Sequence, residues 1–116
     1  MAKSKYRIYH NPRCSKSRQA LELLRGNGIE PEVIEYLKTP PSEKQLKTLL
    51  QKLGIEASEL VRKGEQVFKD DYRGKDLSNS DWINAMVEHP KLMERPIIET
   101  EDKAVVGRPP ELALSI

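Results

Sequence analysis

The only cysteine of this 116-residue chain, Cys14, lies in a basic and hydroxyl-rich segment, His10-Asn11-Pro12-Arg13-Cys14-Ser15-Lys16-Ser17-Arg18. A single cysteine cannot form a disulfide within its own chain. Reactive cysteines lie in electropositive surroundings, whereas structural cysteines are buried among apolar residues. Because the neighbours of Cys14 are charged and polar, we predict that this thiol is a nucleophile.

The predicted secondary structure places Cys14 where a helix begins. The alternating run from Tyr6 to Tyr9 predicts a first strand. From Ser15 onward, apolar residues at helical spacing predict a helix that Gly28 closes. The start of a helix has unpaired N–H groups and a partial positive charge, which favour a thiolate and can bind a tetrahedral oxyanion. A nucleophile and an anion site are therefore predicted at one place.

Ser17 stands three residues after Cys14, where dithiol oxidoreductases carry a second cysteine. A serine cannot resolve a disulfide, so an oxidised Cys14 would have to be reduced by an outside thiol, such as glutathione or the cysteine of another protein. The Ser17 hydroxyl itself has two possible roles. It can contact the anion, or it can satisfy N–H groups in the first turn of the helix.

The order of the other predicted elements indicates the fold. Glu32 to Leu37 predicts a strand parallel to the first, because a helix connects the two. The later elements are a helix from the Ser42/Gln45 capping box to Gly54, a turn at Leu60–Arg62, a helix at Trp82–Val87, a hairpin of Ile97–Glu99 with Ala104–Val106, and a helix from Pro109 to the C-terminus. The polar segment from Glu65 to Asp81 is left unassigned. We predict one α/β domain, residues 1–116, with a thioredoxin-like fold. A helical insertion at about 42–90 would separate its N-terminal βαβ unit from its C-terminal ββα unit.

The composition argues against several classes of protein. A net charge of +2 and 5% aromatic residues do not favour nucleic-acid binding. No apolar run approaches the about 18 residues of a membrane span, and no signal peptide is visible at the N-terminus. Together with the free cysteine, this predicts a reducing, cytoplasmic location. One cysteine and two distant histidines make no tetrahedral zinc site, so we expect no metal and no bound cofactor.

Five motifs occur in order along the chain: Asn11–Arg18, Tyr36–Pro41, Leu60–Arg62, His89–Ile97 and Val106–Pro110. With these motifs the sequence resembles the glutaredoxin-linked arsenate reductase (ArsC) family, in its shorter, arsenate-reductase-like branch. The resemblance covers essentially the whole chain. It implies that the chain reduces arsenate, or a similar oxyanion, to arsenite, with glutathione as co-substrate and a glutaredoxin that recycles Cys14.

The resemblance also implies roles for individual residues. Cys14 would attack the oxyanion, and Arg62, Arg95 and Arg108 would bind it. We also expect Ser15 and Ser17, next to Cys14, to contact the bound oxyanion. Arginine suits this role because its planar fork donates to two oxygens and stays charged. His10 would tune the thiolate electrostatically, although a local hydrogen bond at the strand end is an alternative role. Pro96 would follow a cis peptide bond near the site, whereas only about 5–6% of X-Pro bonds in folded proteins are cis.

Two other functions fit the same residues. A general glutathione-dependent thiol oxidoreductase would use Cys14 and Pro96 but would not need three converging arginines. A transcriptional regulator like the Spx proteins would share the fold and bind RNA polymerase. Such regulators usually carry a Cys-x-x-Cys switch, and Ser17 argues against that function.

Overall fold

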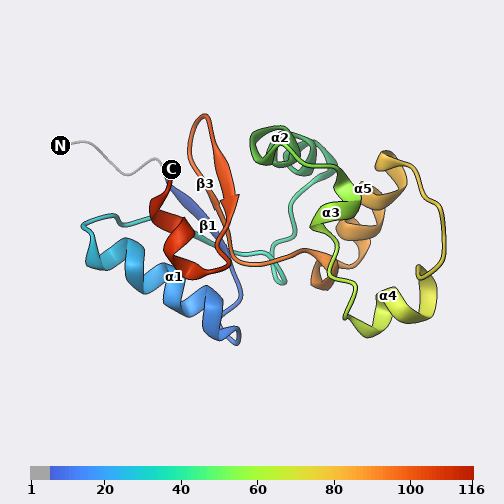
Figure 1. Cartoon of the computed structure of the whole chain (residues 1–116), viewed down its shortest axis with the longest axis horizontal. Coiled ribbons are helices and arrows are strands. Elements are labelled where there is room, and N and C mark those ends of the chain that lie inside the picture. The colour runs from blue at the N-terminus through green and yellow to red at the C-terminus, as the bar shows by residue number, and fades with distance from the viewer. Residues whose placement is uncertain (1–5) are drawn as a thin grey trace. The chain divides into compact units, whose positions relative to one another are not determined.

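The computed structural model describes residues 6–116, which form two compact units. The first unit is built from the chain up to Thr39 together with Arg95–Ile116, and the second is Pro40–Glu94 (Figure 1). The second unit contains the predicted helical insertion. The single-domain organisation stays a prediction, and the predicted absence of a signal peptide concerns residues 1–5, which lie outside the described residues.

The first unit contains a four-stranded mixed sheet. Its elements are β1 (Arg7–His10), α1 (Ser15–Gly26), β2 (Glu32–Glu35), β3 (Ile97–Glu99), β4 (Ala104–Val106) and the 3-10 helix η2 (Pro110–Leu114). The strand order is β2-β1-β3-β4. β1 runs parallel to β2 and antiparallel to β3, and β3 and β4 form an antiparallel hairpin. The βαβ unit and the hairpin of the predicted α/β fold are therefore confirmed.

A small apolar core joins α1 and η2 to one face of this sheet. Ile8 and Ile98 lie opposite each other in the β1–β3 register, and both are fully buried. They form a cluster with Ala20, Leu21 and Leu24 of α1 and Ala113 of η2. This packing fixes the start of α1 relative to the C-terminal end of β1, and Cys14 lies between the two.

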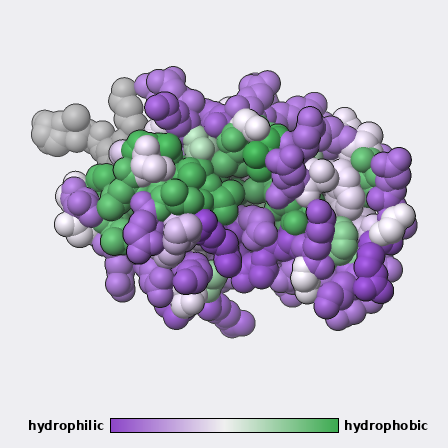
Figure 2. All heavy atoms as spheres, in the orientation of Figure 1, coloured by the Kyte–Doolittle hydropathy of each residue, from purple (hydrophilic) through white to green (hydrophobic). Residues whose placement is uncertain are grey.

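The C-terminal segment differs from its prediction. It forms a 3-10 helix, Pro110–Leu114, rather than an α-helix. A segment this short, opened by two prolines that lack N–H donors, gains little from α-helical hydrogen bonds, and 3-10 turns are common in such pieces. Figure 2 shows apolar surface where η2 lies in Figure 1, and Leu112 and Leu114 are 37% and 40% exposed.

The second unit is helical. Its elements are α2 (Glu43–Leu53), α3 (Ala57–Leu60), α4 (Gln66–Asp71), α5 (Asn79–Glu88) and the 3-10 helix η1 (Pro90–Leu92). The predicted capping box of Ser42 and Gln45 starts α2, and Gly54 ends it with a left-handed φ of 70°. The predicted turn at Leu60–Arg62 is only partly helical, because α3 ends at Leu60 and Val61 pairs with Met93. None of the helices in residues 6–116 has the length and apolar character needed to cross a bilayer.

Candidate active site

Cys14 is the N-cap residue of α1, as the sequence predicts. Its backbone is extended, with φ −94° and ψ 121°, and its N–H donates to the carbonyl oxygen of Asn11 at 2.9 Å. The residue is 8% exposed, and the first turn of α1 carries no acidic side chain. The thiol is therefore held at the positive end of a 12-residue helix with no carboxylate in that turn to oppose an anion.

The first turn of α1 presents open backbone donors. Within residues 6–116, no acceptor takes a hydrogen bond from the N–H groups of Ser15, Lys16 or Ser17. The Cys14 side chain occupies the N-cap position, from which an oxygen would normally accept from such donors, yet it makes no capping hydrogen bond. These N–H groups are thus available to an anion bound beside the sulfur.

Arg108 contacts the Cys14 thiol. Its Nη2 lies 3.8 Å from Sγ of Cys14, and its Nε donates to the backbone carbonyl oxygen of Arg95 at 2.7 Å. The hydrogen bond to the Arg95 carbonyl oxygen orients the Arg108 guanidinium, so its contact with the Cys14 sulfur does not depend on a freely rotating side chain. The structure therefore brings two of the predicted residues, Cys14 and Arg108, together.

Arg95 supplies buried donors that have no partner. Its Nε and Nη1 are both buried and make no hydrogen bond. Buried polar groups without a partner are rare, and a buried guanidinium without one is costly. An oxyanion could accept from both nitrogens. The Arg95–Pro96 bond is cis, which confirms the prediction for Pro96. The Arg108–Pro109 bond is also cis, and no sequence pattern predicts this isomer.

His10 and Ser17 form a buried pair. Nδ1 of His10 lies 2.6 Å from Oγ of Ser17, and the same Oγ accepts a hydrogen bond from the backbone N–H of Asn11 at 3.0 Å. Burial lowers the pKa of His10; Glu35 opposes this change, and Arg25 and Arg18 add to it. In the neutral imidazole the Ser17 hydroxyl can donate to Nδ1, which leaves the ring proton on Nε2.

This pair bears on two predicted roles. The Ser17 hydroxyl is fully buried and engaged with His10 and Asn11, so the structure does not present it to the N–H groups of α1. His10 makes the local hydrogen bond that was its alternative role. Ser15 is exposed at the first position of α1, and within the described chain its side chain makes no hydrogen bond. Anion binding by either serine and thiolate tuning by His10 stay predictions.

Arg62 belongs to the second unit. Its guanidinium pairs with the carboxylate of Glu65, and its Nε lies 3.6 Å from Oε1 of Glu94. Its predicted part in anion binding stays a prediction. In the part of the chain that the structure describes, no three His, Cys, Asp or Glu residues gather as a metal site would require.

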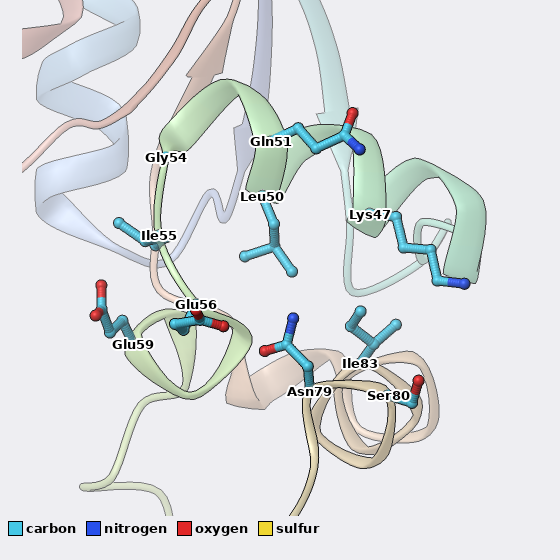
Figure 3. A pocket seen from close by; sticks show the side chains of 10 residues that line it. All are labelled: Lys47, Leu50, Gln51, Gly54, Ile55, Glu56, Glu59, Asn79, Ser80 and Ile83. Carbon is cyan, nitrogen blue, oxygen red and sulfur yellow. The ribbon is translucent and has the colours of Figure 1, made fainter.

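The second unit also holds an open groove between α2, α3 and α5, with a cavity volume of about 710 Å³ (Figure 3). Leu50, Ile55 and Ile83 provide apolar lining, while Glu56 and Glu59 place carboxylates at it. The cationic group of this groove, Lys47, is paired with Glu43. None of the predicted site residues lines the groove, and its carboxylates would disfavour an oxyanion, so we place the candidate site at Cys14.

The chain is similar in sequence and in structure to several known proteins. A sequence model of the ArsC family matches residues 9–116. "Uncharacterized protein YfgD" of Escherichia coli K12 is 52% identical over 112 residues, which is 95% of this chain and 94% of that protein. An arsenate reductase of Neisseria meningitidis serogroup A is 44% identical over 107 residues, 90% of this chain and 92% of the reductase. The solved structure of an arsenate reductase from Vibrio cholerae has a TM-score of 0.95 at 47% identity and covers 99% of both chains.

Proposed function

The chain belongs to the ArsC family, and from this premise we propose that it reduces arsenate to arsenite with Cys14 as the nucleophile. The observation that carries the proposal is the contact of the Arg108 guanidinium with the Cys14 sulfur at 3.8 Å. It is supported by the 44% identity to a protein named arsenate reductase. An oxyanion-binding cation and a nucleophile in contact are what attack on a bound oxyanion requires.

The binding step uses three kinds of donor from the first unit. Arg108 offers the guanidinium nitrogens that are not engaged with Arg95, and Arg95 offers its two buried nitrogens. The open N–H groups at the start of α1 complete the set. Arg108 and the N–H groups of α1 are held in place before the anion arrives, so they stabilise charge that develops on the arsenic oxygens without reorganisation. We propose Arg62 as a third arginine for the same anion, as the family resemblance implies.

The chemical step begins when the Cys14 thiolate attacks arsenic. An S–As bond forms while an As–O bond breaks, and the leaving oxygen departs as water after it takes up a proton. The thiolate of glutathione then attacks the Cys14 sulfur. An S–S bond forms, the electron pair of the S–As bond stays on arsenic, and As(V) becomes As(III), which leaves as arsenite. The two electrons come from the two sulfur atoms, which end as a mixed disulfide.

The return step needs a thiol from outside the chain, because the sequence holds one cysteine. We propose that a glutaredoxin thiolate attacks the glutathione sulfur of the mixed disulfide and releases the Cys14 thiolate. This use of glutathione and glutaredoxin fits a reducing compartment, so we propose a cytoplasmic location as well.

The experiment that tests the function measures arsenite formation from arsenate by the purified protein. Three arms are compared: glutathione with glutaredoxin, glutathione alone, and thioredoxin with its reductase. We expect sustained turnover in the first arm only, and none in any arm with Cys14→Ser. Turnover by Cys14→Ser at the rate of the wild type would contradict the proposal. Reduction of a glutathione mixed disulfide without any arsenate reduction would favour the general thiol oxidoreductase instead.

A further inference from the structure

Arg18 holds the Cys14 loop from the first turn of α1. Its Nη1 donates to the carbonyl oxygen of Pro12 at 2.8 Å, and its backbone N–H donates to the carbonyl oxygen of Cys14 at 3.0 Å. One residue is thus bonded to the loop on both sides of Arg13. Neither the sequence motif nor the family resemblance assigned a role to Arg18.

The other polar groups of this loop are also engaged. The Asn11 N–H donates to Ser17 Oγ, the Asn11 side-chain oxygen accepts from the Arg13 N–H at 3.0 Å, and the Asn11 carbonyl accepts from the Cys14 N–H. The Pro12 carbonyl oxygen is a further acceptor in this turn, and it accepts a hydrogen bond from the Arg18 side chain of α1. Arg18 therefore completes a set of hydrogen bonds that fixes the turn preceding the nucleophile.

The guanidinium of Arg18 forms no ion pair among residues 6–116. The nearest acidic residue in the sequence is Glu22, four positions further along α1. The cations Arg7 and Arg25 of the same unit, by contrast, pair with Glu32 and Glu30. The Pro12 contact is thus the only hydrogen bond that the Arg18 side chain makes in the described chain.

We propose that Arg18 is a positioning residue for Cys14, an assignment that rests on the proposed function. By holding the Pro12 carbonyl, Arg18 keeps the Asn11–Cys14 turn in the conformation that sets the Cys14 sulfur against Arg108 and the open N–H groups of α1. The positive charge of Arg18 also contributes to the lowered pKa of His10, which packs against the same turn through Ser17.

Loss of the Arg18 contact has a defined consequence. Without it, the Pro12 carbonyl must find water, and the turn gains conformations in which the sulfur no longer faces its stabilising groups. The thiolate is then less stabilised and less often in the reactive position. Arg18 does not touch the reacting atoms in this account, so its removal lowers reactivity at the sulfur without removing any donor of the anion site.

The test compares Arg18→Met with Arg13→Met. Both remove one positive charge next to Cys14, but only the first removes a side-chain hydrogen bond, because the Arg13 side chain is exposed and makes none within the described residues. The readouts are the rate constant of Cys14 alkylation by iodoacetamide at pH 7, kcat/KM for arsenate, and Tm. For Arg18→Met we expect a loss of about three- to tenfold in the first two readouts, the scale of one solvent-exposed hydrogen bond from a charged group. Arg13→Met should stay within about twofold of the wild-type alkylation rate, and Arg18→Lys should recover part of the loss.

The proposal is overturned if folded Arg18→Met and Arg13→Met alkylate within twofold of each other. Should Arg18→Met not fold, Arg18→Gln and Arg13→Gln are compared by the same criterion. The alkylation rate needs no arsenate, so it judges Arg18 even if the wild type makes no arsenite. In that case the proposed function fails, while the positioning of Cys14 by Arg18 is still decided.

Discussion

Nη2 of Arg108 lies 3.8 Å from Sγ of Cys14, although 94 positions separate the two residues in the chain. The contact is possible because β1 leads into Cys14 while the β3–β4 hairpin leads into Arg108, and β1 and β3 are neighbours in the sheet. The Arg95 carbonyl fixes the guanidinium from the other side. The sheet thus brings the proposed nucleophile, from one end of the sequence, next to the proposed anion-binding arginine from the other end.

Arg108→Lys tests whether the shape of the guanidinium matters as well as its charge. A lysine ammonium keeps the positive charge, but it lacks the planar guanidinium, which contacts the Arg95 carbonyl oxygen and the Cys14 sulfur through two different nitrogens. We expect kcat/KM for arsenate to fall about 10²-fold or more, the scale of losing one fixed donor to a developing oxyanion. Steady-state arsenite formation measures this. Activity within threefold of the wild type would show that charge alone suffices.

Arg95→Met tests whether the unpartnered donors are kept for the anion. Removing a guanidinium whose Nε and Nη1 are buried and unpaired should leave the free energy of unfolding unchanged or raise it by about 1 kcal/mol. Arsenate should raise the Tm of the wild type, because it binds the folded state only, and should not raise that of Arg95→Met. Thermal unfolding with and without arsenate measures both. A large loss of stability together with an intact response to arsenate would contradict this role.

The lowered pKa of His10 leads us to expect that the free energy of unfolding decreases in mild acid. Burial lowers the pKa of His10 below its usual value of about 6.5. The unfolded chain therefore binds a proton at His10 more readily than the folded chain does. The part of the free energy of unfolding that depends on neutral His10 is complete above about pH 6.5, and it is lost as the pH falls below that value. Urea unfolding at pH 7.5 and 5.5 should show a larger decrease for the wild type than for His10→Asn, whose amide can still bond Ser17. Equal decreases in the two proteins would rule out a neutral, buried His10.

The close packing around Gly107, between Arg95 and Arg108 in the first unit, leaves no room for a side chain at this position. A Cβ at this position would lie 2.9 Å from Cδ1 of Ile98 and 3.0 Å from Cγ of Pro96, and the Gly107 N–H donates to the Pro96 carbonyl at 2.8 Å. Gly107→Ala should therefore cost about 1–3 kcal/mol and reduce arsenate turnover, because Pro96 and Arg108 flank the clash. Gly26→Ala is the matched control, since nothing lies within 4 Å of that Cβ. It should be neutral or slightly stabilising in the same denaturation series. Equal stability of the two variants would contradict the close packing at Gly107.

Much of the fold could be predicted because local signals and tertiary packing agree. The Ser42/Gln45 capping box starts α2 as predicted, and the strands at Ile97–Glu99 and Ala104–Val106 have their predicted bounds. The start of α1 after Cys14 is also as predicted, and this placement is what made the thiol recognisable. Caps and strands of this kind are determined by residues that are close in the sequence, so they can be predicted without knowledge of the tertiary contacts.

Features that depend on distant contacts were beyond the sequence. The helix α4 lies in the polar segment from Glu65 to Asp81, where the sequence pattern predicts no element. Its buried Phe68 stacks on Trp82 of α5. The engagement of the Ser17 hydroxyl by His10 joins a strand end to a helix turn, and no spacing rule predicts such a pair. The role of Arg18 was missed for the same reason, because its partner is a backbone carbonyl rather than a side chain. A second capping box, Ser78 with Asp81, could have been found from the spacing alone.

A single turnover tests the central claim, that the Cys14 sulfur attacks the oxyanion, most directly. Protein, arsenate and glutathione are mixed without glutaredoxin, and arsenite is quantified while intact-mass and peptide analysis locate any glutathione on the protein. We predict one arsenite for each glutathione joined to Cys14, and neither product from Cys14→Ser. Arsenite formed with Cys14 unmodified, or formed equally by Cys14→Ser, would contradict the account.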